Sequence, residues 1–196
     1  MFYRTLSAVL IGLASTAPLV AVLAQDEFVW SNIDCAESRI IAPDGLKCRA
    51  TQNYPGGRAN DAAADGKAIF HAWSAYGTRG DAKLYYFLSE AISPGTFHRP
   101  TKNLVEIMVN RGEQGEDTKH FSRPQKTTGG DYLTFTSSKG ESYFGELHSC
   151  LGIRKLGQVQ GDGYKWVLYA TRCVPGQQSM TEADAIRFLA ETGYKP

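Results

Sequence analysis

The stretch YFGELHSCLGIRKLGQVQGDGYKWVLYATRC, residues 143–173, carries the clearest β-hairpin pattern in the chain. Its middle holds Gly161-Asp162, and a glycine at the first position of a two-residue loop is typical of a type II′ turn between antiparallel strands. The sequence therefore predicts two antiparallel strands, over 143–154 and 164–173, joined around this turn.

The same hairpin predicts a disulfide. With a two-residue loop at the turn, Cys150 lies directly opposite Cys173, at a separation that a disulfide can bridge. Counted from the turn, the two cysteines occupy a hydrogen-bonded position of the ladder, and a bulge at Gly152 or Gly157 would shift the register. The prediction therefore depends on the regularity of both strands.

The other two cysteines, Cys35 and Cys48, flank a turn at residues 42–45 between two short extended pieces. All four cysteines follow residue 24, and an even count in an exported chain indicates two disulfides. Close pairs such as C-x-x-C, which zinc sites and thioredoxin-like redox motifs need, are absent from the sequence. We therefore expect the disulfides Cys35–Cys48 and Cys150–Cys173, and no zinc.

Export is predicted by residues 1–24. Arg4 precedes a nearly uncharged apolar run over residues 6–24 that ends in Val-Leu-Ala, small or apolar residues of the kind that a signal peptidase recognises. We expect cleavage of a signal peptide there and a mature chain that begins at Gln25. The alternative is an uncleaved membrane anchor, because about 20 apolar residues can span a bilayer. Pro18 inside the run favours the signal peptide.

The mature chain, residues 25–196, has a length typical of one domain and sufficient for a hydrophobic core. The full chain has 21 basic and 20 acidic residues, and loss of Arg4 leaves 20 of each. A neutral chain without a long basic run has no global field that attracts nucleic acid or an anionic membrane surface. We therefore predict a single exported domain, periplasmic or extracellular, that binds neither nucleic acid nor, after cleavage, a membrane.

Polar segments rich in glycine alternate with apolar ones between the two cysteine pairs. Residues 53–67 are predicted to form a surface loop with a short helical turn at 61–64. The apolar stretches that follow suit two strands, joined by a three-residue hairpin loop at 78–80. A helix over 81–92 is an alternative, because its leucines and isoleucine repeat every four residues.

Three more elements are predicted before the quoted stretch. Residues 103–110 read as a short apolar strand, and 111–131 as a polar loop that is long for a plain connection. Residues 132–136 alternate as a strand, and 137–140 are expected to form the turn after it.

The C-terminal segment SMTEADAIRFLAETGYKP, residues 179–196, has the period of an amphipathic helix. Thr181 is the expected N-cap, and Gly193 the expected end. The buried face is formed by Ala185, Phe188, Leu189 and, less clearly, Thr192. The predicted fold class is therefore α+β or mainly β: an antiparallel sheet or sandwich of hairpins with a C-terminal helix and two disulfides.

Arg79-Gly80-Asp81 is the tripeptide that many secreted ligands present to adhesion receptors. Adhesion requires a projecting loop, which a hairpin tip provides. A three-residue motif often occurs by chance, however, and turns favour glycine and aspartate for conformational reasons. We therefore interpret it as a turn between two strands.

Glu146 and His148 are the strongest candidates for catalysis. Two residues apart on a strand, they point the same way, and a carboxylate can orient a histidine as a general base. No nucleophile motif such as G-x-S-x-G accompanies them, and Cys150 on the same face is expected to be oxidised. We therefore favour a half-exposed polar strand face over an active site, and assign no catalytic residue.

Metal binding is not predicted. The four histidines, His71, His98, His120 and His148, are scattered without H-x-H or H-E-x-x-H spacing, and we interpret His71 as a core or interface residue. Residues 111–117, RGEQGED, lack the spacing of a calcium loop. Tyrosine and tryptophan suit binding surfaces and sheet cores equally, so the aromatic residues do not locate a site.

The sequence thus favours a small exported binding or interaction protein on a rigid β scaffold, without a cofactor and with an unknown protein or carbohydrate as its ligand. One alternative is a small hydrolase that acts on a polysaccharide or a peptide through Glu146 and His148. Another is a structural subunit held at a membrane by an uncleaved N-terminus.

Overall fold

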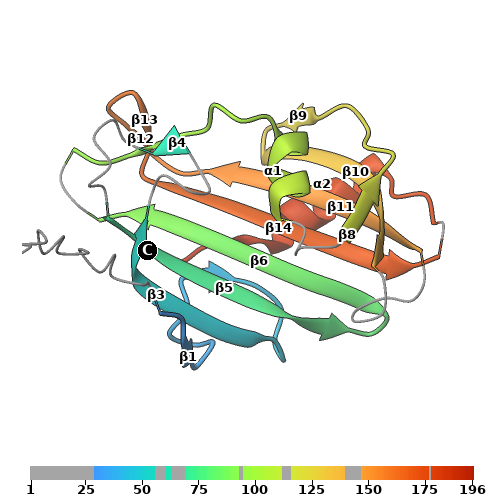
Figure 1. Ribbon diagram of the computed structural model, residues 1–196, viewed down its shortest axis with the longest axis horizontal. Helices are drawn as coiled ribbons and strands as arrows, with labels where there is room; N and C mark the ends of the chain where they lie inside the picture. The colour runs from blue at the N-terminus through green and yellow to red at the C-terminus, as the bar shows by residue number, and fades with distance from the viewer. Residues whose placement is uncertain are drawn as a thin grey trace, which may run out of the picture.

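The computed structural model describes residues 29–55, 61–62, 69–92, 95–111, 116–139, 147–176 and 178–196. A nine-stranded antiparallel sheet forms the centre of the fold (Figure 1). Its strands are, in spatial order, β1 (Ser31–Ile33), β3 (Lys47–Pro55), β5 (Ile69–Arg79), β6 (Ala82–Ala91), β14 (Trp166–Pro175), β11 (His148–Leu156), β10 (Gly130–Lys139) and β8 (Glu116–Lys119), and β9 (Gln125–Thr127) also pairs with β10. The prediction of a mainly β, antiparallel fold is confirmed, and the strands gather in one large sheet.

Two smaller sheets and two helices complete the described structure. A four-stranded sheet has the order β12 (Val159–Gln160), β13 (Gly163–Tyr164), β7 (His98–Arg99) and β4 (Asp61–Ala62). A two-stranded sheet pairs β15 (Gly193–Tyr194) with β2 (Ile40–Ile41). Helix α1 spans Leu104–Arg111, and helix α2 spans Glu182–Glu191.

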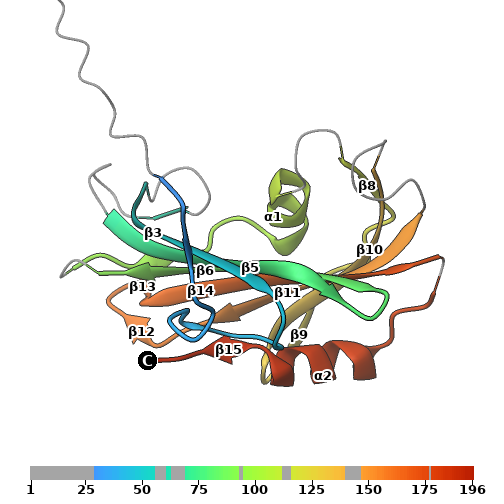
Figure 2. The ribbon, with the colours of Figure 1, turned by 90° about the horizontal axis from the view of Figure 1, so that it is seen from below.

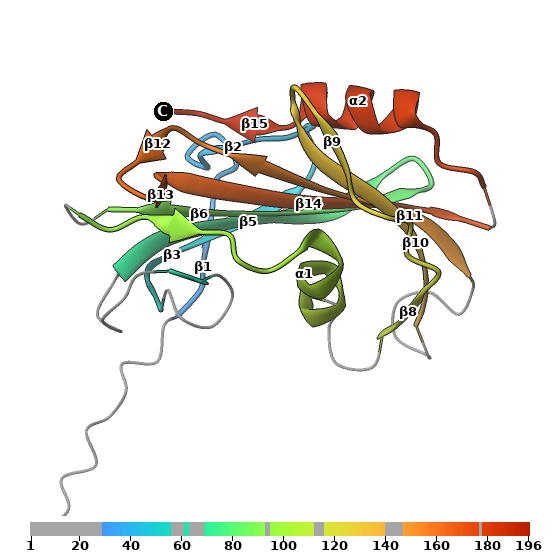
Figure 3. The same cartoon turned by 90° about the horizontal axis from the view of Figure 1, so that it is seen from above.

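The two helices lie on opposite faces of the large sheet, as Figures 2 and 3 show from its two sides. Because successive residues of a strand point to opposite faces, a sheet covered on both faces needs apolar residues in both directions. Strand β6 accordingly is buried along nearly its whole length. The α1 face buries Phe87, Leu133, Phe135, Val167 and Tyr169, among others. The α2 face buries Trp73, Tyr86, Leu88, Ile153 and Leu168, among others.

The hairpin predicted around Gly161-Asp162 is present. Strands β11 and β14 pair so that Cys150 faces Cys173, and the two cysteines form the predicted disulfide. The residues on either side of the loop pair with each other, and Gly161 has the positive φ of +57° that this two-residue turn requires. Near the turn, the two arms leave the large sheet and form β12 and β13.

The cysteine pair occupies a different position in the ladder from the predicted one. The backbone N–H groups of Gly157 and Gly176 donate across the strand pair on either side of the disulfide. Regular alternation between them makes Cys150–Cys173 a non-hydrogen-bonded pair, and its Cα–Cα distance of 4.1 Å fits this narrower spacing. The backbone N–H of Lys165 also donates across the hairpin, so two adjacent residue pairs are hydrogen-bonded near the turn. This irregularity shifts the alternation of hydrogen-bonded and non-hydrogen-bonded pairs by one residue before it reaches the disulfide.

The prediction of a strand over 103–110 is wrong, because this segment forms helix α1. Asn103 is its N-cap: its side-chain oxygen accepts the Glu106 N–H at 3.0 Å, and its amide donates to the Glu106 carboxylate at 2.9 Å. Leu104, Ile107 and Met108 are buried, which is the spacing of one helical face. A run this short and this apolar resembles a buried strand, so the capping pair is the signal that separates the two.

Residues 111–131 are not one loop. Strands β8 and β9 lie within this segment, and both pair with β10. Strand β10 extends to Lys139, through most of the turn predicted at 137–140. Polar residues form strands here because pairing with a longer neighbour satisfies their backbone groups, while an edge position demands few apolar side chains.

The segment 53–67 also differs from its prediction where it is described. Strand β3 continues to Pro55, and Asp61–Ala62 form strand β4, which pairs with β7. The predicted helical turn at 61–64 is therefore wrong at its first two residues. The pairing with β7, which is distant in sequence, determines the local conformation.

The C-terminal helix is confirmed. Thr181 and Asp184 form a reciprocal capping box at its start, and Ala185, Phe188 and Leu189 are buried against the sheet. The helix ends at Glu191, and the next residues enter β15, which pairs with β2 and returns the C-terminus to the N-terminal part of the chain.

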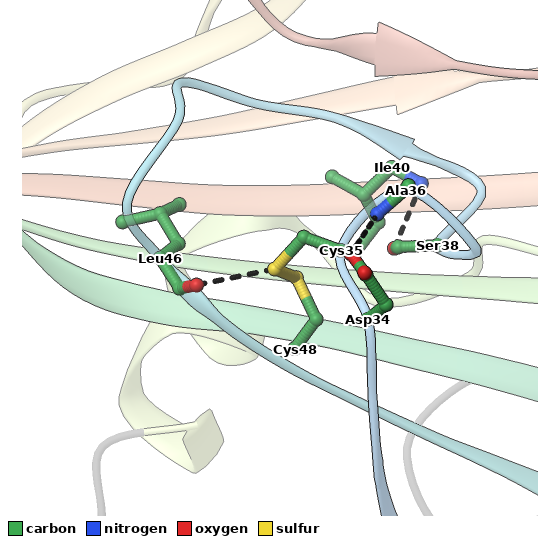
Figure 4. Close-up of a disulfide and its surroundings, with 7 residues drawn as sticks. All are labelled: Asp34, Cys35, Ala36, Ser38, Ile40, Leu46 and Cys48. Atoms are coloured by element: carbon green, nitrogen blue, oxygen red, sulfur yellow. Dashed lines mark hydrogen bonds between the residues drawn. A yellow bond between two sulfur atoms is a disulfide. The ribbon is translucent and has the colours of Figure 1, made fainter.

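The second predicted disulfide, Cys35–Cys48, is also present (Figure 4). It joins the loop after β1 to the start of β3. Two side chains in this loop accept backbone N–H groups two residues further on, Asp34 at 2.9 Å and Ser38 at 3.2 Å. The disulfide and these local turns together hold the loop against β3.

The predicted signal peptide, residues 1–24, lies outside the described residues. Within the described ranges, neither helix is both long and apolar enough to cross a membrane.

Candidate functional site

A groove of about 240 Å³ lies on the α2 face, beside the end of the sheet that carries the β5–β6 turn. We call it the arginine groove. Its lining consists of Pro43, Arg79, Ala82, Leu84, Tyr86, Arg172, Arg187, Phe188 and Glu191. Figure 2 shows the setting, with α2 and the light-blue segment between β1 and β3 on one side of the sheet and α1 on the other.

Three elements that are distant in sequence supply the arginines of the groove. Arg79 is the last residue of β5, and Arg172 lies on β14 opposite Leu84 of β6. Arg187 comes from the second turn of α2. Because side chains alternate along a strand, Arg172 points to the same face of the sheet as Leu168 and Ala170, which are buried there. A cation therefore occupies a strand position where an apolar core residue is expected.

Two of the three guanidinium groups of the groove lack the carboxylate partner that several other arginines of this fold have. Arg39, Arg99 and Arg154 each form an ion pair with a carboxylate. Within the described residues, Arg79 and Arg172 have neither an ion pair nor a side-chain hydrogen bond.

Two acidic residues lie near these arginines. Arg187 is 4.0 Å from Asp184 of its own helix, at the limit of an ion pair. Glu191 is the one carboxylate among the described residues that line the groove. The lining therefore carries three positive charges and one negative charge, and Asp184 partly compensates Arg187 and Arg172 from outside it.

The floor of the groove is apolar and fixed. Tyr86 and Phe188 are buried and pack against each other with ring centroids 5.9 Å apart. Burial raises the pKa of Tyr86 to about 12, so its hydroxyl stays protonated at neutral pH. The site therefore combines a rigid base with charged side chains on its walls, and it presents no ionised group from its floor.

The adhesion-like tripeptide lies at the β5–β6 turn, as predicted, and 82–91 form a strand rather than the alternative helix. The loop is shorter than predicted, because Arg79 pairs with Ala82 and leaves only Gly80 and Asp81 between the strands. Gly80 has a φ of +57°, which suits the first position of a two-residue turn. The side chain of Arg79 lines the arginine groove.

The candidate pair Glu146 and His148 is described only in part, since Glu146 lies outside the described residues. His148 begins β11 and is 4% exposed. The interpretation of a half-exposed strand face is therefore wrong at His148. By strand alternation His148 lies on the side of Cys150, which is the α1 face, so it is separated from the arginine groove by the sheet.

The remaining histidines do not converge. His71 packs edge-on against Trp73, His120 follows β8, and His98 is 1% exposed on β7. Across the described ranges, no group of three or more metal-ligating side chains is close enough to hold an ion. Most of the acidic segment 111–117 lies outside those ranges or carries no described side chain.

His98 is an unusual core residue. Its ring lies 4.5 Å from that of Phe70, and neither ring nitrogen meets the geometry of a hydrogen bond, although the Ser89 backbone favours the charged form to a small extent. Burial lowers its pKa to about 4, so the imidazole is neutral over most of the pH range. Burial of this imidazole lowers the stability of the folded state. Among the described residues, His98 belongs to no group of three or more metal-ligating side chains.

Sequence reasoning also missed a second charged region on the α2 face. Glu90 is 3% exposed, and Arg39 donates to it at 2.7 Å while the Tyr194 hydroxyl donates at 2.8 Å. Lys165 lies 3.8 Å from the same carboxylate. We call these four residues the Glu90 cluster. It joins the segment before β2 and strand β15 to the large sheet, and both of its cations lie beside the one buried carboxylate.

The arginine groove is therefore the best candidate for a binding site. Sequence reasoning did not single out Arg172 or Arg187. The signal that could have indicated the groove is Arg172, an arginine at a core-facing position of a predicted strand. The chain matches no family model, no curated protein and no solved structure, so the function has to be inferred from the groove itself.

Proposed function

We propose that this chain is an exported, disulfide-stabilised binding protein without catalytic activity, and that the arginine groove is its ligand site. The observation that carries the proposal is the pair of arginines, Arg79 and Arg172, that line an open groove and form neither an ion pair nor a side-chain hydrogen bond in the described structure. Placing uncompensated charges side by side costs stability, and a bound ligand offsets that cost.

The scaffold supports a binding role in a second way. Two disulfides fix the N-terminal loop and the central hairpin, and both lie outside the groove. A preorganised site loses little conformational entropy when a ligand binds. Two disulfides are also consistent with an oxidising, exported environment.

The alternatives have less support. A hydrolase that depends on His148 requires that residue to reach a substrate, and His148 is 4% exposed on the face opposite the groove. A membrane-held structural subunit depends on the N-terminal apolar run, which remains a prediction from the sequence alone.

The experiment is a ligand-dependent melting screen with glycans, peptides and small metabolites on three proteins. Glu191→Trp adds bulk at the groove, while Ile186→Trp adds the same bulk on the same helix, at a side chain that is 50% exposed and outside the groove. We expect ligands to raise the melting temperature of the wild type and of Ile186→Trp, and to lose their effect on Glu191→Trp. Equal stabilisation of all three proteins would place the ligand elsewhere. Turnover of any ester, glycan or peptide in the panel would contradict the non-enzymatic role.

A further inference from the structure

We infer that the ligand of the arginine groove carries a doubly charged oxyanion, a phosphate or sulfate group, on a hydroxyl-bearing body such as a sugar. The inference rests on the proposed function, because it assigns the chemistry of the same site. It is carried by the charge of the groove, the geometry of its arginines and its size.

The charges of the groove favour more than one negative charge on the ligand. Among the described residues that line it, Arg79, Arg172 and Arg187 are positive and Glu191 is negative. Asp184 lies 4.0 Å from Arg187 and also attracts Arg172, so it compensates part of the excess from outside the lining. Arg79 and Arg172 form no ion pair and no side-chain hydrogen bond in the described structure. A doubly charged group can pair with both of these arginines, whereas a group with one negative charge compensates only one of them.

The chemistry of the guanidinium group favours an oxyanion over a halide or another compact anion. Each guanidinium presents its N–H donors in a planar fork that matches two oxygens of a phosphate, a sulfate or a carboxylate. The three arginines come from β5, β14 and α2, so they approach the groove from different elements. A tetrahedral group offers oxygens in several directions at once, and a planar carboxylate does not.

The size of the groove limits the part of the ligand that it holds. Its volume of about 240 Å³ is below the roughly 300–1,000 Å³ that is typical of sites that enclose a drug-sized molecule. The groove therefore suits a charged head group with a small body attached, or the end of a larger chain.

Glu191 selects for the body of the ligand. A carboxylate beside an anion site opposes a bare dianion, unless the ligand also supplies a donor to it. A hydroxyl group next to the phosphate or sulfate provides that donor, and a hydrogen bond to a charged acceptor is stronger than one between neutral groups. A hydroxylated ligand is therefore expected to bind better than the inorganic ion.

The test measures the affinity of the full exported chain for glucose 6-phosphate, inorganic sulfate and glucose by isothermal titration calorimetry. We expect glucose 6-phosphate to bind more tightly than sulfate, and glucose not to bind. Arg172→Gln should weaken glucose 6-phosphate binding at least tenfold, because it removes a charge-assisted hydrogen bond. Arg172→Lys, which keeps the charge and loses the fork, should fall between the wild type and Arg172→Gln.

The control removes one positive charge at a distance. Arg99 lies on β7 in the four-stranded sheet, at the other end of the molecule (Figure 1), where it pairs with Asp162. Arg99→Gln should bind glucose 6-phosphate like the wild type. Equal weakening by Arg99→Gln and Arg172→Gln would show that only net charge matters, and would overturn the inference.

The pH dependence tests the number of charges on the ligand. A phosphate ester loses its second charge below a pKa of about 6, whereas sulfate keeps both charges. Affinity for glucose 6-phosphate should therefore fall about threefold or more between pH 7.5 and 5.5, and affinity for sulfate should stay constant or rise. Tyr86 at the floor of the groove keeps its proton over this range, because burial raises its pKa to about 12. Asp184 beside Arg187 stays ionised, because its hydrogen bonds with Thr181 hold the pKa of this carboxyl below its ordinary value.

The outcomes separate this inference from the proposed function. Absence of oxyanion binding, together with a neutral ligand whose effect is lost in Glu191→Trp, would overturn the inference and leave the groove as the ligand site. Oxyanion binding that is unchanged in both Arg172 variants would overturn both.

Discussion

The arginine groove and the Glu90 cluster lie on the same face of one sheet and use the same residue type in opposite ways. In the Glu90 cluster, Arg39 is held between a buried carboxylate and two aromatic rings, those of Trp73 and Tyr194. In the groove, Arg172 forms no ion pair and no side-chain hydrogen bond in the described structure, and only the nearby Asp184 compensates its charge in part. An arginine that pairs with a buried carboxylate stabilises this fold, whereas an arginine without such an ion pair at a groove indicates a ligand site.

The largest expected effect is loss of the cation in the Glu90 cluster. Glu90 is 4% exposed at its side chain and Arg39 is 41% exposed, so removal of Arg39 leaves the more buried charge without its main partner. We expect Arg39→Met to lower the free energy of unfolding by about 3 kcal/mol, with Lys165 compensating in part. Chemical denaturation of the variant measures this change.

Arg99→Met provides the matched control, because the partner of Arg99 is 82% exposed and stays hydrated when the pair is broken. The expected change there is below about 1 kcal/mol. Equal effects in the two variants would show that burial of the carboxylate does not determine the energy of these pairs.

The histidine on β7 extends the comparison to a polar group that is neither paired nor charged. Burial lowers the pKa of His98 to about 4, against 6.5 in the unfolded chain. Above pH 6.5, His98 is mostly unprotonated in both the folded and the unfolded chain. Between pH 6.5 and pH 4, His98 binds a proton in the unfolded chain but not in the folded protein. Stability therefore falls as the pH falls, by about 2 kcal/mol between pH 7 and pH 5 from this residue.

His98→Leu isolates this contribution. The variant carries its own packing cost at every pH, so the relevant quantity is the slope of unfolding free energy against pH. We expect the slope of His98→Leu between pH 7 and 5 to be shallower than that of the wild type. Parallel curves would mean that His98 binds its proton equally in the folded and unfolded states, so that its pKa is not lowered by folding.

A smaller effect is expected from the hydroxyl of the Glu90 cluster. The Tyr194 hydroxyl donates to Glu90 and accepts from Arg39, both at 2.8 Å. Tyr194→Phe keeps the ring that stacks on Trp166 and removes only these bonds. We expect a loss of about 1 to 2 kcal/mol in unfolding free energy, since the acceptor is charged and buried. A loss as large as that in Arg39→Met would show that the hydroxyl, and not the cation, holds Glu90.

The sequence predicts those parts of this molecule that local chemistry determines. The turn at Gly161, the disulfide that follows from it and the cap at Thr181 depend on residues close in sequence, and all three are present. Helix α1 was missed even though its cap at Asn103 is equally local, because a short apolar run suits both a strand and a buried helix.

The charged regions were missed for a different reason. Glu90 acquires its partners from the residue before β2, from β15 and from the residue before β14. No pattern near Glu90 in the sequence indicates an ion pair. The groove needs Arg79, Arg172 and Arg187 from three separate elements. Strand alternation alone indicates that Arg172 faces inward, but only the sheet order brings it beside the end of β5 and under α2.

The smallest expected effect is also the one that distinguishes the two regions most directly. Arg172 is repelled by Arg79 and Arg187 and forms no ion pair or side-chain hydrogen bond in the described structure, while Asp184 offsets only part of the repulsion. Its removal should therefore relieve the folded state slightly. We expect Arg172→Gln to raise the free energy of unfolding by about 0.5 kcal/mol at low ionic strength, opposite in sign to Arg39→Met. The gain should shrink at high salt, because solvent-accessible charges are screened over about 3 Å at 1 M. Denaturation curves at both ionic strengths measure it. If Arg172→Gln is destabilising and insensitive to salt, Arg172 has a structural partner, and its assignment as a cation reserved for a ligand is wrong.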